Sequence, residues 1–148
     1  MSIGRICQRN VDLADADESV RFVAERMHQR SVGSLVVLDE WKRPIGIITD
    51  RDIVIRVIAA GKDPDMTQVC EAMTASPRTV TENTSIEQAI RLMRSGVFRR
   101  LPVVDRDGKL VGLVAADDIL CPLAEEFADV GRLLERETPQ EVASLGAP

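Results

Sequence analysis

The stretch that decides the fold is Gly46-Ile47-Ile48-Thr49-Asp50-Arg51-Asp52, which leaves an apolar strand and enters a helix. A second copy, Gly112-Leu113-Val114-Ala115-Ala116-Asp117-Asp118, follows at an offset of 112 − 46 = 66 residues. The same offset aligns further identical pairs without any insertion, among them Met27 with Met93, Leu35 with Leu101 and Asp39 with Asp105. A match that keeps both pattern and register indicates an internal duplication. One difference inside it concerns chemistry, because Thr49 of the first copy is Ala115 in the second.

Each repeat is expected to begin with a helix. The segments Asp17-Glu18-Ser19 and Asn83-Thr84-Ser85 are typical helix starts. Apolar residues then recur with helical spacing, at Val20, Val23, Ala24 and Met27 in the first repeat and at Ile86, Ala89, Ile90 and Met93 in the second. Both helices therefore present an apolar face that needs a packing partner.

A hairpin and a second helix follow in each repeat. The predicted strands are Leu35–Leu38 and Ile45–Ile48, matched by Leu101–Val104 and Val111–Val114. Asp107-Gly108 between two apolar runs is a strong hairpin signal. The second helix begins near Asp50 or Ala116. This order predicts a mixed α+β fold of two pseudo-symmetric repeats packed together, because one repeat alone would have a marginal core.

The expected division of the chain is residues 1–62 for repeat 1, 63–121 for the linker and repeat 2, and 122–148 for a C-terminal helix and tail. Val69–Met73 is predicted to form a short helix within the linker. The segment Leu123–Glu137 is amphipathic, with Leu123, Phe127, Val130 and Leu134 on one face. That face packs either on its own domain or on a partner, and Thr138–Pro148 is expected to be a loose tail.

Composition excludes several classes of function. The net charge is −5 and aromatic residues make up 3% of the chain, which disfavours binding to nucleic acid through phosphates or base stacking. No apolar run approaches the roughly 18 residues needed to span a bilayer, and the first residues lack the apolar core of a signal peptide. A cytoplasmic protein without a membrane partner is therefore expected.

Catalytic and metal-binding residues are not expected. The single histidine, His28, lies off the apolar face of its helix, and no established catalytic motif occurs. Cys7, Cys70 and Cys121 are widely spaced and show no metal-ligand spacing. They are interpreted as small buried apolar residues, although a Cys7–Cys70 disulfide stays open.

Thr49 and Asp52 allow two interpretations. Threonine at a helix start with an acid three residues later forms a capping box, in which each side chain satisfies a free backbone N–H. The same position also suits a ligand, because the start of a helix presents N–H groups to a phosphate. Thr49 could donate its hydroxyl to that phosphate, and Asp52 could accept hydrogen bonds from the two vicinal hydroxyls of a ribose.

The duplicated hairpin that ends in Gly-x-x-[Ser/Thr]-x-x-Asp resembles cystathionine-β-synthase (CBS) domains. Two further stretches carry the resemblance, Arg100-Leu101-Pro102-Val103-Val104-Asp105 and Glu71-Ala72-Met73-Thr74. The likeness extends from about Ile3 to Leu120 and is strongest to small stand-alone bacterial CBS pairs. It implies units of βαββα type that pair into a Bateman module with two clefts.

The resemblance implies which residues line each cleft. The first, stronger cleft would contain Ile47, Thr49 and Asp52, together with Pro77, Arg78, Phe98, Arg99 and Arg100 from the other repeat. The second cleft would contain Val32, Gly33, Ser34, Leu113 and Asp118. Because Ala115 has no hydroxyl and Ser34 replaces the counterpart of Arg100, the second cleft is expected to bind a nucleotide weakly or not at all.

The function implied by the resemblance is that of a ligand sensor rather than an enzyme. AMP, ADP or ATP would bind without being a required cofactor, and a homodimer or an unknown protein target would respond to the ligand. The alternative is a structural or interaction module whose clefts bind no physiological nucleotide. On that alternative, Thr49 and Asp52 only cap a helix.

Overall fold

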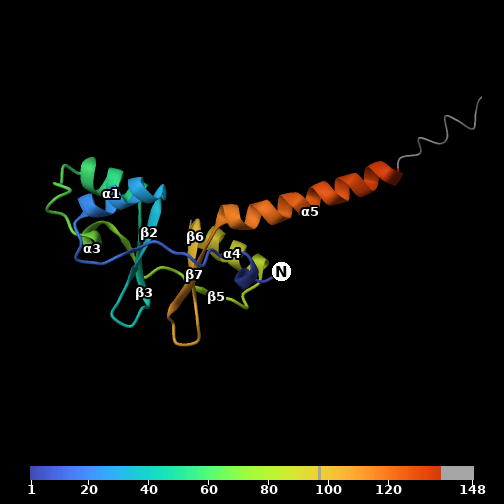
Figure 1. The fold of residues 1–148 in the computed structure, drawn as a ribbon, viewed down its shortest axis with the longest axis horizontal. Helices are drawn as coiled ribbons and strands as arrows, with labels where there is room; N and C mark the ends of the chain where they lie inside the picture. The colour runs from blue at the N-terminus through green and yellow to red at the C-terminus, as the bar shows by residue number, and fades with distance from the viewer. Residues whose placement is uncertain (97, 138–148) are drawn as a thin grey trace, which may run out of the picture. The chain divides into compact units, whose positions relative to one another are not determined.

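The computed structural model describes residues 1–96 and 98–137 and divides the chain into two compact units, one ending at Ala116 and the other starting at Asp117. The first unit holds two sheets, one of four strands in the order β1-β2-β3-β4 and one of three in the order β5-β6-β7. Helices pack beside both sheets, so the predicted mixed α+β fold is confirmed (Figure 1).

Both repeats follow the order β-α-β-β-α. Repeat 1 comprises β1 (Leu13–Ala14), α1 (Val20–Arg30), β2 (Ser34–Leu38), β3 (Pro44–Thr49) and α2 (Asp50–Ile53), which continues as a π-helical turn, η2 (Val54–Ile58). Repeat 2 comprises β5 (Val80–Thr81), α4 (Ile86–Gly96), β6 (Arg100–Val104), β7 (Leu110–Ala115) and α5 (Ala116–Glu137). Both predicted hairpins are present, one in each repeat, and each strand is one or two residues longer than predicted.

The two hairpins share one register. Leu35 pairs with Ile48 in the first, and Leu101 pairs with Val114 in the second, which is the same pairing moved by 66 residues. Both hairpins also carry a bulge at the same place. Their tips meet, because the N–H of Leu110 donates to the carbonyl of Lys42 at 2.9 Å (Figure 1). The duplication in sequence is therefore a duplication of backbone structure.

The core of the first repeat is aliphatic, as the scarcity of aromatic residues requires. The predicted apolar face of α1 is buried through Val20, Val23 and Met27. These residues pack with the inward-facing side chains of the hairpin, which include Leu35 and Ile48. Burial of such side chains supplies most of the stabilisation of a fold like this.

The lead-in segments of the two repeats are exchanged. The N-terminal turn η1 (Ile3–Arg5) bonds to repeat 2, where the N–H of Ile3 donates to the carbonyl of Thr84. The linker helix α3 (Val69–Ala72) makes the equivalent bond to repeat 1, from Val69 to Glu18. Strand β4 (Thr74–Ala75) then pairs with β3. The segment that precedes each repeat therefore packs on the other repeat.

Gly46 and Gly112 lie where the exchanged segments cross the hairpins. A Cβ atom on Gly46 would lie 2.3 Å from the Sδ of Met73, and one on Gly112 would lie 3.0 Å from both the Sγ of Cys7 and the carbonyl oxygen of Gln8. Cys7 and Met73 are related by the same offset of 66. The close approach of a crossing segment is therefore the reason that both copies need glycine.

Up to Glu137, the second unit is one helix where the sequence suggested two segments. α5 runs through Pro122 without a break over 22 residues. Proline removes one backbone N–H from the helix, and here the helix continues past it. Phe127, Val130 and Leu134, from the predicted apolar face, are 77%, 54% and 60% exposed. The predicted tail, Thr138–Pro148, lies outside the described residues.

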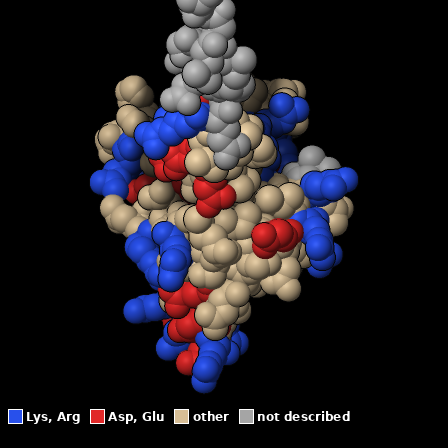
Figure 2. Space-filling view, turned by 90° about the vertical axis from the view of Figure 1, so that its right-hand side faces the viewer, with Lys and Arg blue, Asp and Glu red and all other residues tan. Residues whose placement is uncertain are grey.

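The surface corrects one interpretation of the cysteines. Cys70 and Cys121 are exposed, Cys7 is half-buried, and all three are free thiols. Cys70 lies on the exposed side of α3, because the residues that this short helix buries are Val69 and Ala72. Basic and acidic side chains are interspersed on the face shown in Figure 2. Within the described ranges, no helix has the length and apolarity required to cross a membrane.

Candidate functional site

A cleft in the first unit joins the start of α2 to the segment that leads into β6. Its volume is about 380 Å³, within the range of roughly 300–1,000 Å³ typical of small-molecule sites. It is lined by Ile47, Thr49, Asp50, Arg51, Asp52, Thr74, Pro77, Phe98, Arg99 and Arg100. We call it the first cleft. Residues from both repeats and from the linker form its walls.

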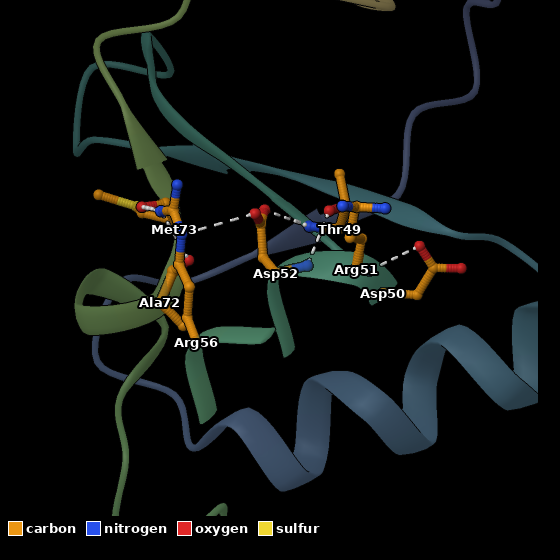
Figure 3. A network of polar contacts seen from close by, with 7 residues as sticks. All are labelled: Thr49, Asp50, Arg51, Asp52, Arg56, Ala72 and Met73. Carbon is orange, nitrogen blue, oxygen red and sulfur yellow. Dashed lines mark hydrogen bonds and ion pairs between the residues drawn. The ribbon is translucent and has the colours of Figure 1, made fainter. Parts of the chain in front are cut away.

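The start of α2 is a complete capping box (Figure 3). The Oγ1 of Thr49 accepts the N–H of Asp52 at 3.1 Å, and the Oδ2 of Asp52 accepts the N–H of Thr49 at 2.9 Å. The capping interpretation is therefore confirmed. The box uses Thr49 and Asp52 as acceptors, so the hydroxyl proton of Thr49 is not engaged by it. Further lone pairs remain on the Asp52 carboxylate, and both side chains line the first cleft.

Positive charge enters the cleft from both repeats. Arg51 lies in the first turn of α2, while Arg99 and Arg100 come from the start of β6. Backbone bonds fix the second pair, because the carbonyl of Arg99 accepts the N–H of Ala116 at 2.9 Å and Arg100 pairs with Ala115 across the hairpin. Three guanidinium groups near a threonine hydroxyl suit a ligand that carries phosphate.

The apolar part of the cleft comes from three different segments. Ile47 lies on β3 and is 9% exposed. Pro77 follows β4, and Phe98 is held beyond α4 by its N–H, which donates to the carbonyl of Met93 at 3.1 Å. Such an arrangement, with apolar walls and a few polar groups at one end, can hold a planar base beside a charged tail.

Seven of the eight residues predicted for the stronger cleft meet in it. The exception is Arg78, which is exposed and is not among the lining residues. Asp50, Arg51 and Thr74 also line the cleft and were not predicted from the sequence. Arg51 belongs to the duplicated stretch, so its place beside Thr49 was a usable signal. Thr74 enters the cleft only because β4 pairs with β3, with Thr74 opposite Ile47, and no local pattern predicts that pairing.

The residues predicted for the second cleft occupy several elements. Val32 packs partly buried against the core, and Ser34 pairs with Thr49 at the open end of the first hairpin. The carbonyl of Gly33 accepts the N–H of Asp50 at 3.0 Å. Leu113 lies on β7 and bonds to Gln8. Asp118 belongs to the second unit, so a cleft shared by all five residues stays a prediction.

Comparison with known proteins agrees with the two-repeat structure. The family model described as the CBS domain matches residues 3–59 and again residues 69–125. The chain is a CBS-domain protein. An uncharacterised protein of Methanopyrus kandleri is 39% identical over 120 residues, which cover 81% of this chain and 61% of that relative.

Solved structures of CBS-domain proteins have the same fold. A CBS-domain protein of Burkholderia ambifaria superposes with a TM-score of 0.77 at 28% identity, covering 83% of this chain and 93% of the other. The AMP complex of CBSX2 gives a TM-score of 0.71 at 27% identity, with coverage of 84% and 96%. This chain is thus a tandem CBS pair, and one structure similar to it holds AMP.

Over residues 1–96 and 98–137, no group of three or more histidine, cysteine, aspartate and glutamate side chains could hold a metal ion. Among the charged groups that line the first cleft, three arginine side chains, which have no lone pair to offer a cation, outnumber two aspartates. Its chemistry therefore favours an anionic organic ligand.

Proposed function

We propose that the first cleft binds an adenosyl nucleotide of the AMP, ADP or ATP type and that this CBS pair acts as a ligand sensor rather than as an enzyme. The observation that carries the proposal is the meeting of Thr49 and Asp52 from one repeat with Arg99 and Arg100 from the other. Asp52 would accept the ribose hydroxyls, and Thr49 with the arginines would hold phosphate. The AMP bound to CBSX2 supports this choice of ligand.

Sensing follows from the position of the cleft between the repeats. A ligand held by both repeats stabilises whichever relative arrangement of them it contacts best, and a difference in affinity between two arrangements is what shifts their populations. A dimer or a protein target could then respond to that shift. Neither nucleic acid nor a membrane is needed for this function.

Calorimetry tests the proposal directly. AMP, ADP, ATP, NADH and S-adenosylmethionine are titrated into the wild type, Asp52→Asn and the matched control Asp118→Asn. We expect an adenosyl nucleotide to bind the wild type, and Asp52→Asn to weaken it about 10- to 100-fold, because a hydrogen bond to a charged group contributes roughly 1.5–3 kcal/mol. Failure of every ligand at millimolar concentration, or a larger loss in Asp118→Asn, would contradict the proposal.

A second candidate is a structural or interaction module without a nucleotide. The capping box favours it, since Thr49 and Asp52 satisfy each other without a ligand. On this hypothesis, substitution of either residue lowers thermal stability and the titrations give no heat of binding. The same set of variants therefore separates the two candidates.

The homodimer is proposed on the aliphatic surface of η2. Val54, Ile55 and Ile58 are 55%, 52% and 56% exposed, although each is a large apolar residue. Adjacent exposed apolar side chains often mark an interface between proteins. Sedimentation is expected to show a dimer that Ile58→Glu converts to monomer, while Lys62→Glu, a control on the same segment, leaves it intact. A monomeric wild type would contradict this proposal.

A further inference from the structure

Arg56 connects the carboxylate of Asp52 to the linker between the repeats (Figure 3). Its Nε lies 3.8 Å from the Oδ1 of Asp52, one helical turn earlier. One of its terminal nitrogens also donates to two backbone carbonyls, that of Ala72 at 3.2 Å and that of Met73 at 2.9 Å. Arg56 is not among the residues that line the first cleft.

The two oxygens of Asp52 are held by different groups. Oδ2 accepts the backbone N–H of Thr49 at 2.9 Å, while Oδ1 faces the guanidinium of Arg56. A carboxylate offers about four lone-pair positions, so each oxygen keeps acceptor capacity after these contacts. The hydrogen bond to Oδ2 fixes one oxygen, and the positive charge of Arg56 favours the rotamer that keeps Oδ1 beside it. Restraint of this kind lowers the ordering that a ligand must impose when it binds.

The segment whose carbonyls bind Arg56 continues directly into the wall of the cleft. Ala72 and Met73 are followed by Thr74, which lines the cleft and pairs with Ile47. Ala72 itself is 1% exposed, so its carbonyl belongs to a packed part of the structure. Arg56 therefore contacts both the Asp52 side of the cleft and the linker through one side chain.

We infer that Arg56 is a positioning residue for recognition of the two ribose hydroxyls. The inference rests on the proposed function, because it takes Asp52 as the acceptor for these hydroxyls. Arg56 would not contact the nucleotide; it would hold Asp52 in the orientation that accepts both hydroxyls. The position 66 residues later is Pro122, so the second repeat cannot place a guanidinium beside Asp118 in this way.

A comparison of two ligands isolates this role. AMP and 2′,3′-dideoxy-AMP share base and phosphate and differ only in the two hydroxyls. Both are titrated into wild type, Arg56→Met and Arg56→Lys. We expect Arg56→Met to weaken AMP about threefold to tenfold, in the range of couplings between neighbouring residues, and to leave the dideoxy compound within about twofold. Arg56→Lys should restore part of the loss, since it keeps the charge.

Other outcomes overturn the inference in distinguishable ways. An equal loss for both ligands, or no loss for either, would mean that Arg56 supports the fold only. Equal binding of both ligands by the wild type would remove the inference and leave nucleotide binding intact. If the wild type binds no nucleotide at all, the proposed function falls and the inference with it. Thermal melting checks each variant, and if Arg56→Met does not fold, a fall in AMP affinity alone in Arg56→Lys decides the question.

Discussion

Thr49 and Ala115 occupy the same position in two hairpins of identical register, yet the side chains around them differ. The first helix start has the hydroxyl of Thr49 and, one turn beyond Asp52, the guanidinium of Arg56. The second has Ala115 and Pro122 in these places. The repeats thus share the residues that set the strand register and fill the core, and they differ in side chains outside the core.

The two helix starts share backbone contacts, because the N–H of Asp50 donates to the carbonyl of Gly33 and the N–H of Ala116 donates to the carbonyl of Arg99. Register, bulge and glycine in each hairpin depend on strand pairing and on the crossing segment, and both repeats retain these features. Backbone pairing sets the position of each helix start. Polar side chains at that start are therefore available for other chemistry, and the first repeat has more of them.

The largest effect is expected in the shared core. Leu35 and Leu101 are both fully buried and occupy equivalent positions. Replacing either with alanine should lower the free energy of unfolding by about 2–5 kcal/mol, because the lost methyl groups leave a cavity. Urea unfolding measures this loss, with Leu→Ile at each site as the control. A loss below roughly 1 kcal/mol in only one repeat would show that the two cores are not equivalent.

The next effect concerns phosphate. Arg100→Ala should weaken AMP by about 1.5–3 kcal/mol, or roughly 10- to 100-fold, and leave adenosine nearly unaffected. Ser34→Ala, the equivalent change in the other repeat, should leave both ligands unaffected. Calorimetry with both ligands makes the comparison. If Ser34→Ala weakens AMP as much as Arg100→Ala does, the first cleft is not the better phosphate site.

Substitution of the two equivalent glycines should give a smaller effect, measured as the free energy of unfolding. Gly46→Ala is expected to lower the free energy of unfolding by about 1–3 kcal/mol, because a methyl group there would overlap the side chain of Met73. Gly112→Ala should cost less, since its nearest neighbours lie at 3.0 Å. Adding Met73→Cys, which copies Cys7, should recover part of the Gly46→Ala loss. Additive losses in that double variant would argue against direct overlap.

The smallest effect is the helix cap. Thr49→Ala should lower the free energy of unfolding by about 1 kcal/mol, because the N–H of Asp52 loses its acceptor. Thr49→Ser, which keeps the hydroxyl, is the control. Ala115→Thr should stabilise the second helix start by up to a similar amount. Thermal melting without ligand measures all three, and an unchanged Thr49→Ala would mean that water replaces the cap.

Much of this structure was predictable from local sequence. The offset of 66 fixed the number of repeats. Start signals and the spacing of apolar residues located the beginnings of α1 and α4, and they located both hairpins within one or two residues. Such predictions succeed because a helix or hairpin of this kind buries one face. The apolar residues of that face recur along the chain at a spacing typical of the element. The capping box at Thr49 was predictable for the same local reason.

Other features could not be predicted because they depend on contacts between distant segments. The exposed Cys70 was misassigned because burial depends on which side of α3 meets the core. The unbroken passage of α5 through Pro122 was not predicted, because a proline inside a helix usually kinks or ends it. Arg78, which the family resemblance placed in the first cleft, is exposed and does not line it, so its part in binding stays a prediction.

By itself, the sequence determined that the chain is a duplicated α+β unit with one better-equipped copy of Gly46–Asp52. Only the tertiary structure decided which segments complete that copy. The linker crosses β3 at Gly46, brings Thr74 into the cleft and places the carbonyls of Ala72 and Met73 where Arg56 can reach them. The physical reason is that secondary structure follows from neighbours along the chain, whereas a cleft is formed by backbone pairing and packing between residues far apart in it.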